Sequence, residues 1–324
     1  MVFPFSLLCM LSLFFSVGLV LSSATWFTAW VGLEMGLLSF IPLIFLGKMR
    51  FSSSEAAMKY FLVQALSSVL FLLSVLFVFG NAFYVLIFSL FLKLGAAPLH
   101  YWMLSVVESM SWPVIFLLLT VQKLPPLVLL SSLVGLSAYI ANFFVFCSAL
   151  VGGLGGFSQM MMRSLLAYSS IGHLSWMIAA LSVDCFLSVQ YLFIYMLILY
   201  PLVYLFLCTN IYHLTQIGSF RLAHLKVIVF FDDSFFSGFT TFFLGFLPKW
   251  IVLSSLMSIE TYFITFVLIL GALVTLYYYL RMTFSSFMFS SSSFFSLLNL
   301  KLGVSSYFVI ISLLGLVFLP AVLF

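Results

Sequence analysis

The chain has 324 residues, of which 65% are hydrophobic and 6% are charged, and its formal net charge is +4. A soluble domain carries about 25% charged residues, so this composition excludes a soluble globular protein and indicates a polytopic membrane protein. The small net charge, without a basic patch, argues against a nucleic-acid partner.

The apolar segments are about 20 residues long, the length of a membrane-spanning helix, whereas the strands of a membrane barrel are about 10 residues long. The sequence therefore predicts an all-α fold of about eleven transmembrane helices. No polar segment is long enough for a second domain, so residues 1–324 are expected to form a single transmembrane helical domain. The spans are expected near residues 3–22, 25–47, 55–79, 83–104, 112–134, 137–156, 162–182, 186–209, 235–258, 260–282 and 304–323.

The charges in the loops support this count. Basic residues fall at the loops that join an even-numbered span to the next odd-numbered one, whereas the opposite loops carry Asp184 and Glu260 but no Lys or Arg. The positive-inside rule then places the basic loops and the N-terminus in the cytoplasm or matrix. The loop-associated basic residues are Lys48, Arg50, Lys59, Arg163, Arg221, Lys226, Arg281 and Lys301.

Four charged residues remain inside the spans: Glu34, Lys93, Lys123 and Lys249. A lysine in hydrocarbon costs about 2.5–3.5 kcal/mol on insertion scales, so charge at this depth usually marks an ion or proton pathway. The alternative is a lysine that snorkels to the headgroups from a helix end. Each lysine has a proline close to it in the sequence, which predicts broken helices near Lys93, Lys123 and Lys249.

These charges suggest a proton relay. Glu34 has apolar neighbours on every helical face, and we expect it to form an ion pair with Lys93 that switches this lysine between holding and releasing a proton. The alternative is a protonated glutamic acid bonded to a neighbouring backbone. His173, in AYSSIGHLSWM, is a further candidate because histidine titrates near neutral pH, although a serine–histidine pair in a membrane is more often an interhelical hydrogen bond.

No cofactor site is indicated in this chain. The four cysteines are scattered and form no Cys-x-x-Cys pair, so neither an iron–sulfur cluster nor a zinc site is expected. The glycine run VGGLGG lacks the preceding strand and following Lys-Ser/Thr of a nucleotide loop, and indicates close helix packing or a flexible span end. The N-terminal stretch resembles neither a secretory signal nor an ordinary transit peptide, so insertion at the site of synthesis is expected.

Six motifs, taken in order, are similar to the antiporter-like membrane subunits of mitochondrial respiratory complex I, the NADH–ubiquinone oxidoreductase. They cover nearly the whole chain and read WVGLEMGLLSFIPLI, EAAMKYFLVQALSSVL, KLGAAPLHYWM, TVQKLPPL, LLAYSSIGHLSWM and GFLPKW. The resemblance implies an antiporter-like fold with broken helices near Lys93 and Lys249. It also implies that Glu34 pairs with Lys93, that Lys123 lies centrally, and that Lys249 and His173 continue the relay.

The resemblance implies a proton-translocating subunit in the membrane arm of the complex, located in the mitochondrial inner membrane with its N-terminus in the matrix. FMN, iron–sulfur clusters and ubiquinone are then expected in other subunits, with no redox centre in this chain. Other membrane-arm subunits and membrane lipids are the expected partners. Family members usually carry a GLPPLTGF-like run before the Pro-Lys-Trp motif, which here reads SGFTTFFLGFLPKW, so the break near Lys249 departs from the family pattern.

Two alternatives to this function remain open. A stand-alone antiporter exchanging protons for Na⁺ or K⁺ is expected to keep more intramembrane acids than Glu34 alone. A structural membrane subunit would hold its buried charges only by pairing, although three lysines at about 2.5–3.5 kcal/mol each are a large cost without a use.

Overall fold

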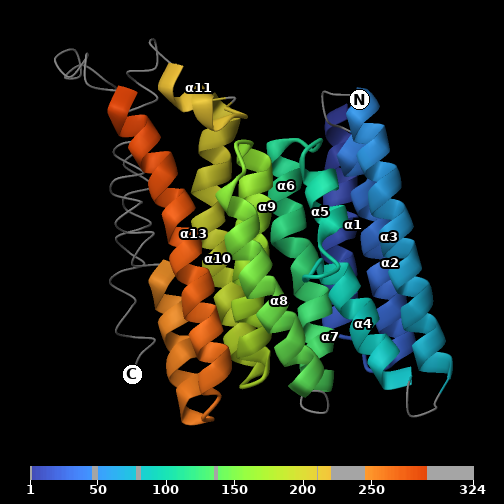
Figure 1. Cartoon of the computed structure of the whole chain (residues 1–324). Helices are drawn as coiled ribbons and strands as arrows, with labels where there is room; N and C mark the ends of the chain where they lie inside the picture. The colour runs from blue at the N-terminus through green and yellow to red at the C-terminus, as the bar shows by residue number, and fades with distance from the viewer. Residues whose placement is uncertain are drawn as a thin grey trace.

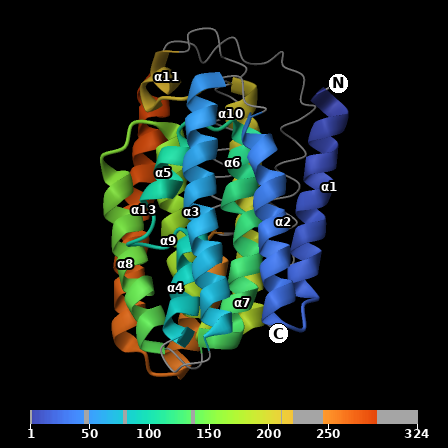
Figure 2. The same cartoon turned by 90° about the vertical axis from the view of Figure 1, so that its right-hand side faces the viewer.

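The computed structural model describes residues 2–45, 50–77, 82–134, 138–209, 211–219 and 245–289. The described part of the chain is helical apart from turns and one isolated bridge between Met161 and His213. It contains seven helices that are long and apolar enough to cross a membrane, together with the shorter apolar helices Phe5–Leu21 and Ala82–Leu94. The helices stand side by side with nearly parallel axes, as the two perpendicular views show (Figure 1 and Figure 2).

The helices follow the predicted spans closely. Each predicted span up to residues 260–282 overlaps a helix or a pair of helices, and the last predicted span, 304–323, lies outside the described residues. The stretch 245–258 is also helical. The labelled elements are α1 (Val2–Leu21), α2 (Trp26–Phe45), α3 (Arg50–Leu76), α4 (Ala82–Leu94), α5 (Tyr101–Val107), α6 (Trp112–Leu119), η1 (Val121–Lys123), α7 (Leu124–Val134), α8 (Ala138–Phe157), α9 (Met162–Leu181), α10 (Cys185–Thr209), α11 (Leu214–Ser219) and α13 (Tyr262–Phe289).

The first helix break separates α4 from α5 and confirms the break predicted near Lys93. α4 ends at Leu94, and Gly95 adopts a φ of 68°, a left-handed conformation that only glycine takes without strain. The turn after it contains a cis peptide bond between Ala97 and Pro98. Lys93 therefore lies in the last turn of a helix that ends inside the bundle.

The second break separates α6 from α7 and contains Lys123. Thr120 leaves helical geometry with φ −121° and ψ −77°, and the 3-10 turn η1 ends at Lys123. Pro125 and Pro126 occupy the first turn of α7, where a missing backbone N–H leaves no intrahelical hydrogen bond unmade. The same prolines prevent α6 from continuing as one regular helix, which places Lys123 at the junction.

No break interrupts the helix that carries Lys249 over the range in which it is described. Residues 245–258 are continuously helical through Pro248 and Lys249. A break near Lys249 on the N-terminal side of residue 245 therefore stays a prediction, and the described helix runs through Pro248 without interruption. The residues before 245 lie outside the described part of the chain.

Helices α8, α9 and α13 pack closely because glycines face one another. A Cβ atom on Gly152 would lie only 2.5 Å from the backbone nitrogen of Gly172, and one on Gly271 would lie 2.9 Å from the carbonyl oxygen of Ala149. Small residues permit such close backbone approach in membrane bundles. The glycine run therefore serves helix packing, as one of its two sequence interpretations stated.

Basic residues gather at one end of the bundle. The N-terminus, the beginning of α9 with Arg163 and the C-terminal part of α13 with Arg281 lie at the same end (Figure 1). Arg163 donates to the carbonyl oxygen of Glu108 at 2.6 Å, and Arg281 donates to the carbonyl oxygens of Phe157 and Gln159 at 2.7 and 2.6 Å. These arginines satisfy loop carbonyls at that end. Among the described residues, the arrangement agrees with the predicted sorting of loop charge.

Candidate functional site

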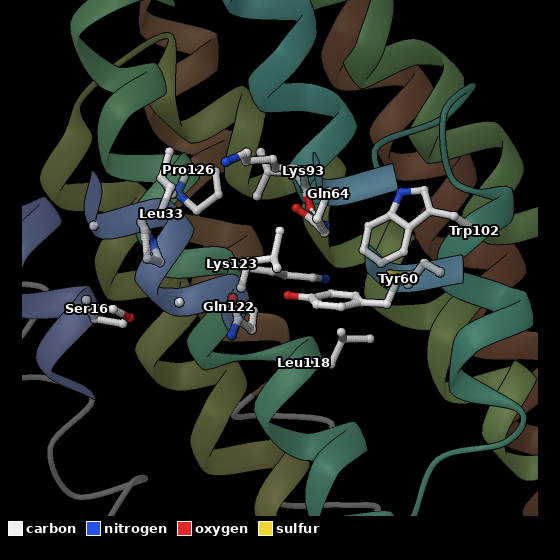
Figure 3. A pocket seen from close by; sticks show the side chains of 17 residues that line it. Ser16, Leu33, Tyr60, Gln64, Lys93, Trp102, Leu118, Gln122, Lys123 and Pro126 are labelled. Atoms are coloured by element: carbon white, nitrogen blue, oxygen red, sulfur yellow. Dashed lines mark hydrogen bonds between the residues drawn. The ribbon is translucent and has the colours of Figure 1, made fainter. Parts of the chain in front are cut away.

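Lys93 and Lys123 line one internal cavity, although 30 positions separate them in the sequence (Figure 3). The cavity has about 30 Å³ available to the centres of water molecules; each water needs about 10–15 Å³, so about two would fit. Polar side chains from α3, α5 and η1 share its wall with apolar ones. The lining residues are Ser16, Val17, Gly32, Leu33, Gly36, Leu37, Tyr60, Gln64, Lys93, Leu94, Trp102, Met103, Leu118, Gln122, Lys123, Pro125 and Pro126.

The central lysine, Lys123, is almost fully enclosed, with 2% of its surface exposed. Its ammonium nitrogen donates to the carbonyl oxygen of Ser170 on α9 at 3.0 Å and lies 5.7 Å from the centroid of the Tyr195 ring. Within the described residues no carboxylate lies within 4.0 Å of it. A carbonyl and an aromatic face stabilise an ammonium group less firmly than an acid would, so this environment suits a group that gives up and regains a proton.

Glu34 does not form the expected direct ion pair with Lys93. The ion pair found at 4.0 Å or less among the described residues joins Glu55 to Lys59, one helical turn apart on α3. Glu34 is half-buried on α2, next in sequence to Leu33, which lines the cavity. Any influence of Glu34 on Lys93 therefore acts without a direct ion pair between the two side chains.

A second, smaller cavity brings together His173 and Lys249. It has about 10 Å³ available to water centres and lies between α9, α13 and the 245–258 helix, a volume close to that of a single water. His173 Nδ1 lies 2.9 Å from the Tyr191 hydroxyl oxygen. The structure thus places the predicted histidine and the third lysine in the wall of one cavity.

Tyr195 stands between the two cavities. Its ring centroid lies 5.7 Å from the Lys123 ammonium nitrogen and 4.8 Å from the centroid of the His173 ring. Tyr195 and Tyr191 are both buried and lie one turn apart on α10. The order in space is therefore Lys93, first cavity, Lys123, Tyr195, His173, second cavity and Lys249.

Sequence reasoning isolated the charged members of this row and missed the polar ones. Gln64 donates to the Lys93 carbonyl oxygen at 3.4 Å, and Tyr60 lines the same cavity. The available signal was their place in the middle of apolar spans, where polar residues usually face the interior of a bundle. Tyr191 and Tyr195 carried a similar signal, since tyrosines of a span normally gather at the membrane interfaces.

Comparison with known proteins identifies the family. Residues 23–82 and 81–275 match the family described as NADH:quinone oxidoreductase/Mrp antiporter, TM. The NADH-ubiquinone oxidoreductase chain 2 of Artemia franciscana is 39% identical over 282 residues, which cover 87% of this chain and 90% of the relative. That of Anopheles gambiae is 37% identical over 295 residues, covering 86% of this chain and 85% of the relative.

Solved structures show the same fold. A chain in respiratory complex I from Thermus thermophilus with bound aureothin is 23% identical, with a TM-score of 0.78, covering 97% of this chain and 78% of that one. A chain in the Mrp complex from a Dietzia species is 15% identical, with a TM-score of 0.79, covering 97% of this chain and 74% of that one. The predicted antiporter-like helical fold is confirmed, and the chain belongs to the NADH-ubiquinone oxidoreductase chain 2 family.

Proposed function

We propose that this chain is a proton-translocating subunit in the membrane arm of respiratory complex I. The observation that supports it best is the row of buried and half-buried groups from Lys93 through Lys123, Tyr195 and His173 to Lys249. Family membership supports the assignment independently. A buried lysine without a nearby acid destabilises a membrane protein, so its presence is best explained by a function such as proton transfer.

In the proposed relay, a proton passes between Lys93 and Lys123 through water in the first cavity. It continues past Tyr195 to His173 and crosses the second cavity to Lys249. A negative charge on Glu34 would stabilise the protonated form of Lys93. A change in the distance between Glu34 and Lys93, or in the protonation of Glu34, would therefore alter how firmly Lys93 holds its proton. Neighbouring subunits would drive that change by movement or by charge.

The proposal includes where the chain works and with what. It lies in the mitochondrial inner membrane, with its basic end and N-terminus in the matrix, as the positive-inside rule requires. Other membrane-arm subunits and lipids cover its apolar surface. FMN, the iron–sulfur clusters and ubiquinone belong to other subunits, and this chain supplies proton conduction to the NADH:ubiquinone reductase.

Proton pumping in inner-membrane vesicles that carry Lys123→Ala in the assembled complex tests this function. We expect pumping per NADH oxidised to fall while assembly is retained. Lys59→Ala is the matched control, because Lys59 is 46% exposed and pairs with Glu55 at the helix surface. Unchanged pumping by an assembled Lys123→Ala complex would contradict the relay and favour a structural subunit.

Reconstitution of the chain by itself in liposomes separates the proposal from the antiporter alternative. A subunit that works only within the complex should not exchange protons for Na⁺ or K⁺, whereas a stand-alone antiporter should. Exchange that depends on Glu34, the acid among the four charged residues predicted inside the spans, would support the antiporter.

A further inference from the structure

The helix break at Lys93 leaves backbone carbonyls that need donors. The last four carbonyl groups of any α-helix lack intrahelical partners, and at membrane depth no bulk water is available to supply them. The Leu92 carbonyl oxygen accepts hydrogen bonds from the Gly95 N–H at 3.2 Å and from the Trp102 indole nitrogen at 3.1 Å. The Lys93 carbonyl oxygen accepts one from Gln64 Nε2 at 3.4 Å.

Gln64 therefore donates a hydrogen bond to the backbone of Lys93, the residue whose side chain carries the proton in the proposed relay. It lies on α3, 29 positions away in the sequence, and is 7% exposed. One helical turn before it, Tyr60 is 2% exposed and lines the same cavity. Figure 3 shows Gln64 and Tyr60 beside Lys93 and Lys123 in the cavity wall.

The remaining hydrogen-bonding capacity of these two side chains fits water. With Nε2 donating to Lys93, the Gln64 amide oxygen still has two lone pairs, and the Tyr60 hydroxyl both donates and accepts. The cavity that they line has room for about two waters. A water that accepts from one lysine and donates to the other needs an additional partner to fix its orientation, and an amide oxygen or a phenol supplies one.

We propose that Gln64, together with Tyr60, is a positioning residue that holds water between Lys93 and Lys123. The proposal rests on the proposed function and adds how its first step is carried out. The Lys93 ammonium gives one N–H proton to the water, and the water gives one O–H proton to the neutral amine of Lys123. One N–H bond breaks and one forms, the water is regenerated, and a single positive charge has moved.

Two substitutions separate water positioning from simple support of the helix break. Gln64→Leu removes both the donor to the Lys93 carbonyl and the acceptor for water, and pumping should fall up to about tenfold, the effect of losing one neutral hydrogen bond. Gln64→Glu retains a donor and an acceptor while the carboxyl is protonated. Once it ionises, it loses the donor and attracts both lysines, so pumping should fall with rising pH in a range where the unmodified complex shows no such step.

Gln190→Leu is the matched control, because it makes the same exchange at a half-buried position on α10 outside both cavities; its pumping and pH profile should match those of the unmodified complex. If Gln64→Leu pumps normally while Lys123→Ala does not, the relay stands and the role of Gln64 is refuted. If Lys123→Ala also pumps normally, the proposed function itself fails. If the pH profile of a Gln64→Glu complex is unaltered, Gln64 only stabilises the helix break at Lys93 and does not position water. The Gln64→Glu variant therefore tests the proposal even if Gln64→Leu fails to assemble.

Discussion

The contact between Gly152 on α8 and Gly172 on α9 leads to a quantitative prediction. In Gly152→Ala the new Cβ atom would lie 2.5 Å from the Gly172 nitrogen and 2.7 Å from its Cα, whereas ordinary contact begins at 3.4 Å. The helices must therefore separate by about 0.9 Å at this point. Both obstructing atoms belong to the backbone, so no side chain can rotate out of the way.

The expected cost of this separation exceeds the benefit of the substitution. Overpacking of a close contact typically costs about 1–3 kcal/mol, whereas alanine in a helix interior gains about 0.5–1 kcal/mol over glycine. We therefore expect Gly152→Ala to lower the midpoint of thermal inactivation of the detergent-extracted complex. Pumping should also fall, because Gly172 and His173 line the second cavity with Lys249.

Two further alanine substitutions serve as controls. A Cβ on Gly172 would meet Thr275 at an ordinary 3.5 Å, and a Cβ on Gly18 would meet nothing within 4 Å. Both should leave the inactivation midpoint unchanged or slightly raised. If Gly152→Ala were as stable as Gly18→Ala, close backbone contact between α8 and α9 would not be what limits this position.

Two predictions concern the relay directly. Glu34→Gln keeps the side-chain shape and breaks no ion pair of 4.0 Å or less among the described residues, so the amount of assembled complex on native gels should be normal. Vesicle pumping should fall because the negative charge proposed to act on Lys93 is removed; unchanged pumping would exclude Glu34 from the relay. Tyr195→Phe retains the ring that faces Lys123 and His173 but loses the hydroxyl. Assembly should be unaffected and pumping should fall at least about tenfold if the hydroxyl carries the proton, whereas normal pumping would assign Tyr195 to packing alone.

The charged part of the site could be predicted because charge is rare in this chain. Sorting the basic residues by loop left Lys93, Lys123 and Lys249 inside spans, and the structure places each of them beside one of two internal cavities. The break after Lys93 was also predictable, since glycine and proline directly indicate where a helix ends. Both predictions depended on single residue types whose cost in a membrane is large.

The contacts between helices could not be predicted in the same way. Whether Glu34 touches Lys93 depends on the rotation of α2 about its axis and on its distance from α4, and composition determines neither. Gln64 contacts Lys93 across 29 positions of the chain, and Lys123 contacts Ser170 across 47. Such partners look like ordinary span residues until the helices are packed. Pro248 did not indicate a break within residues 245–258, which are continuously helical, so a proline alone does not fix where a helix is interrupted.

The two helix interruptions have a mechanical consequence. A continuous helix transmits an axial displacement along its whole length. The pairs α4–α5 and α6–α7, in contrast, are each interrupted beside a lysine, Lys93 or Lys123. A push on α5 from one membrane surface would therefore reach the end of α4, beside Lys93, through the hydrogen bond from the Trp102 indole to the Leu92 carbonyl oxygen. A displacement of α5 by a neighbouring subunit would then change the surroundings of Lys93 without a movement of the whole bundle.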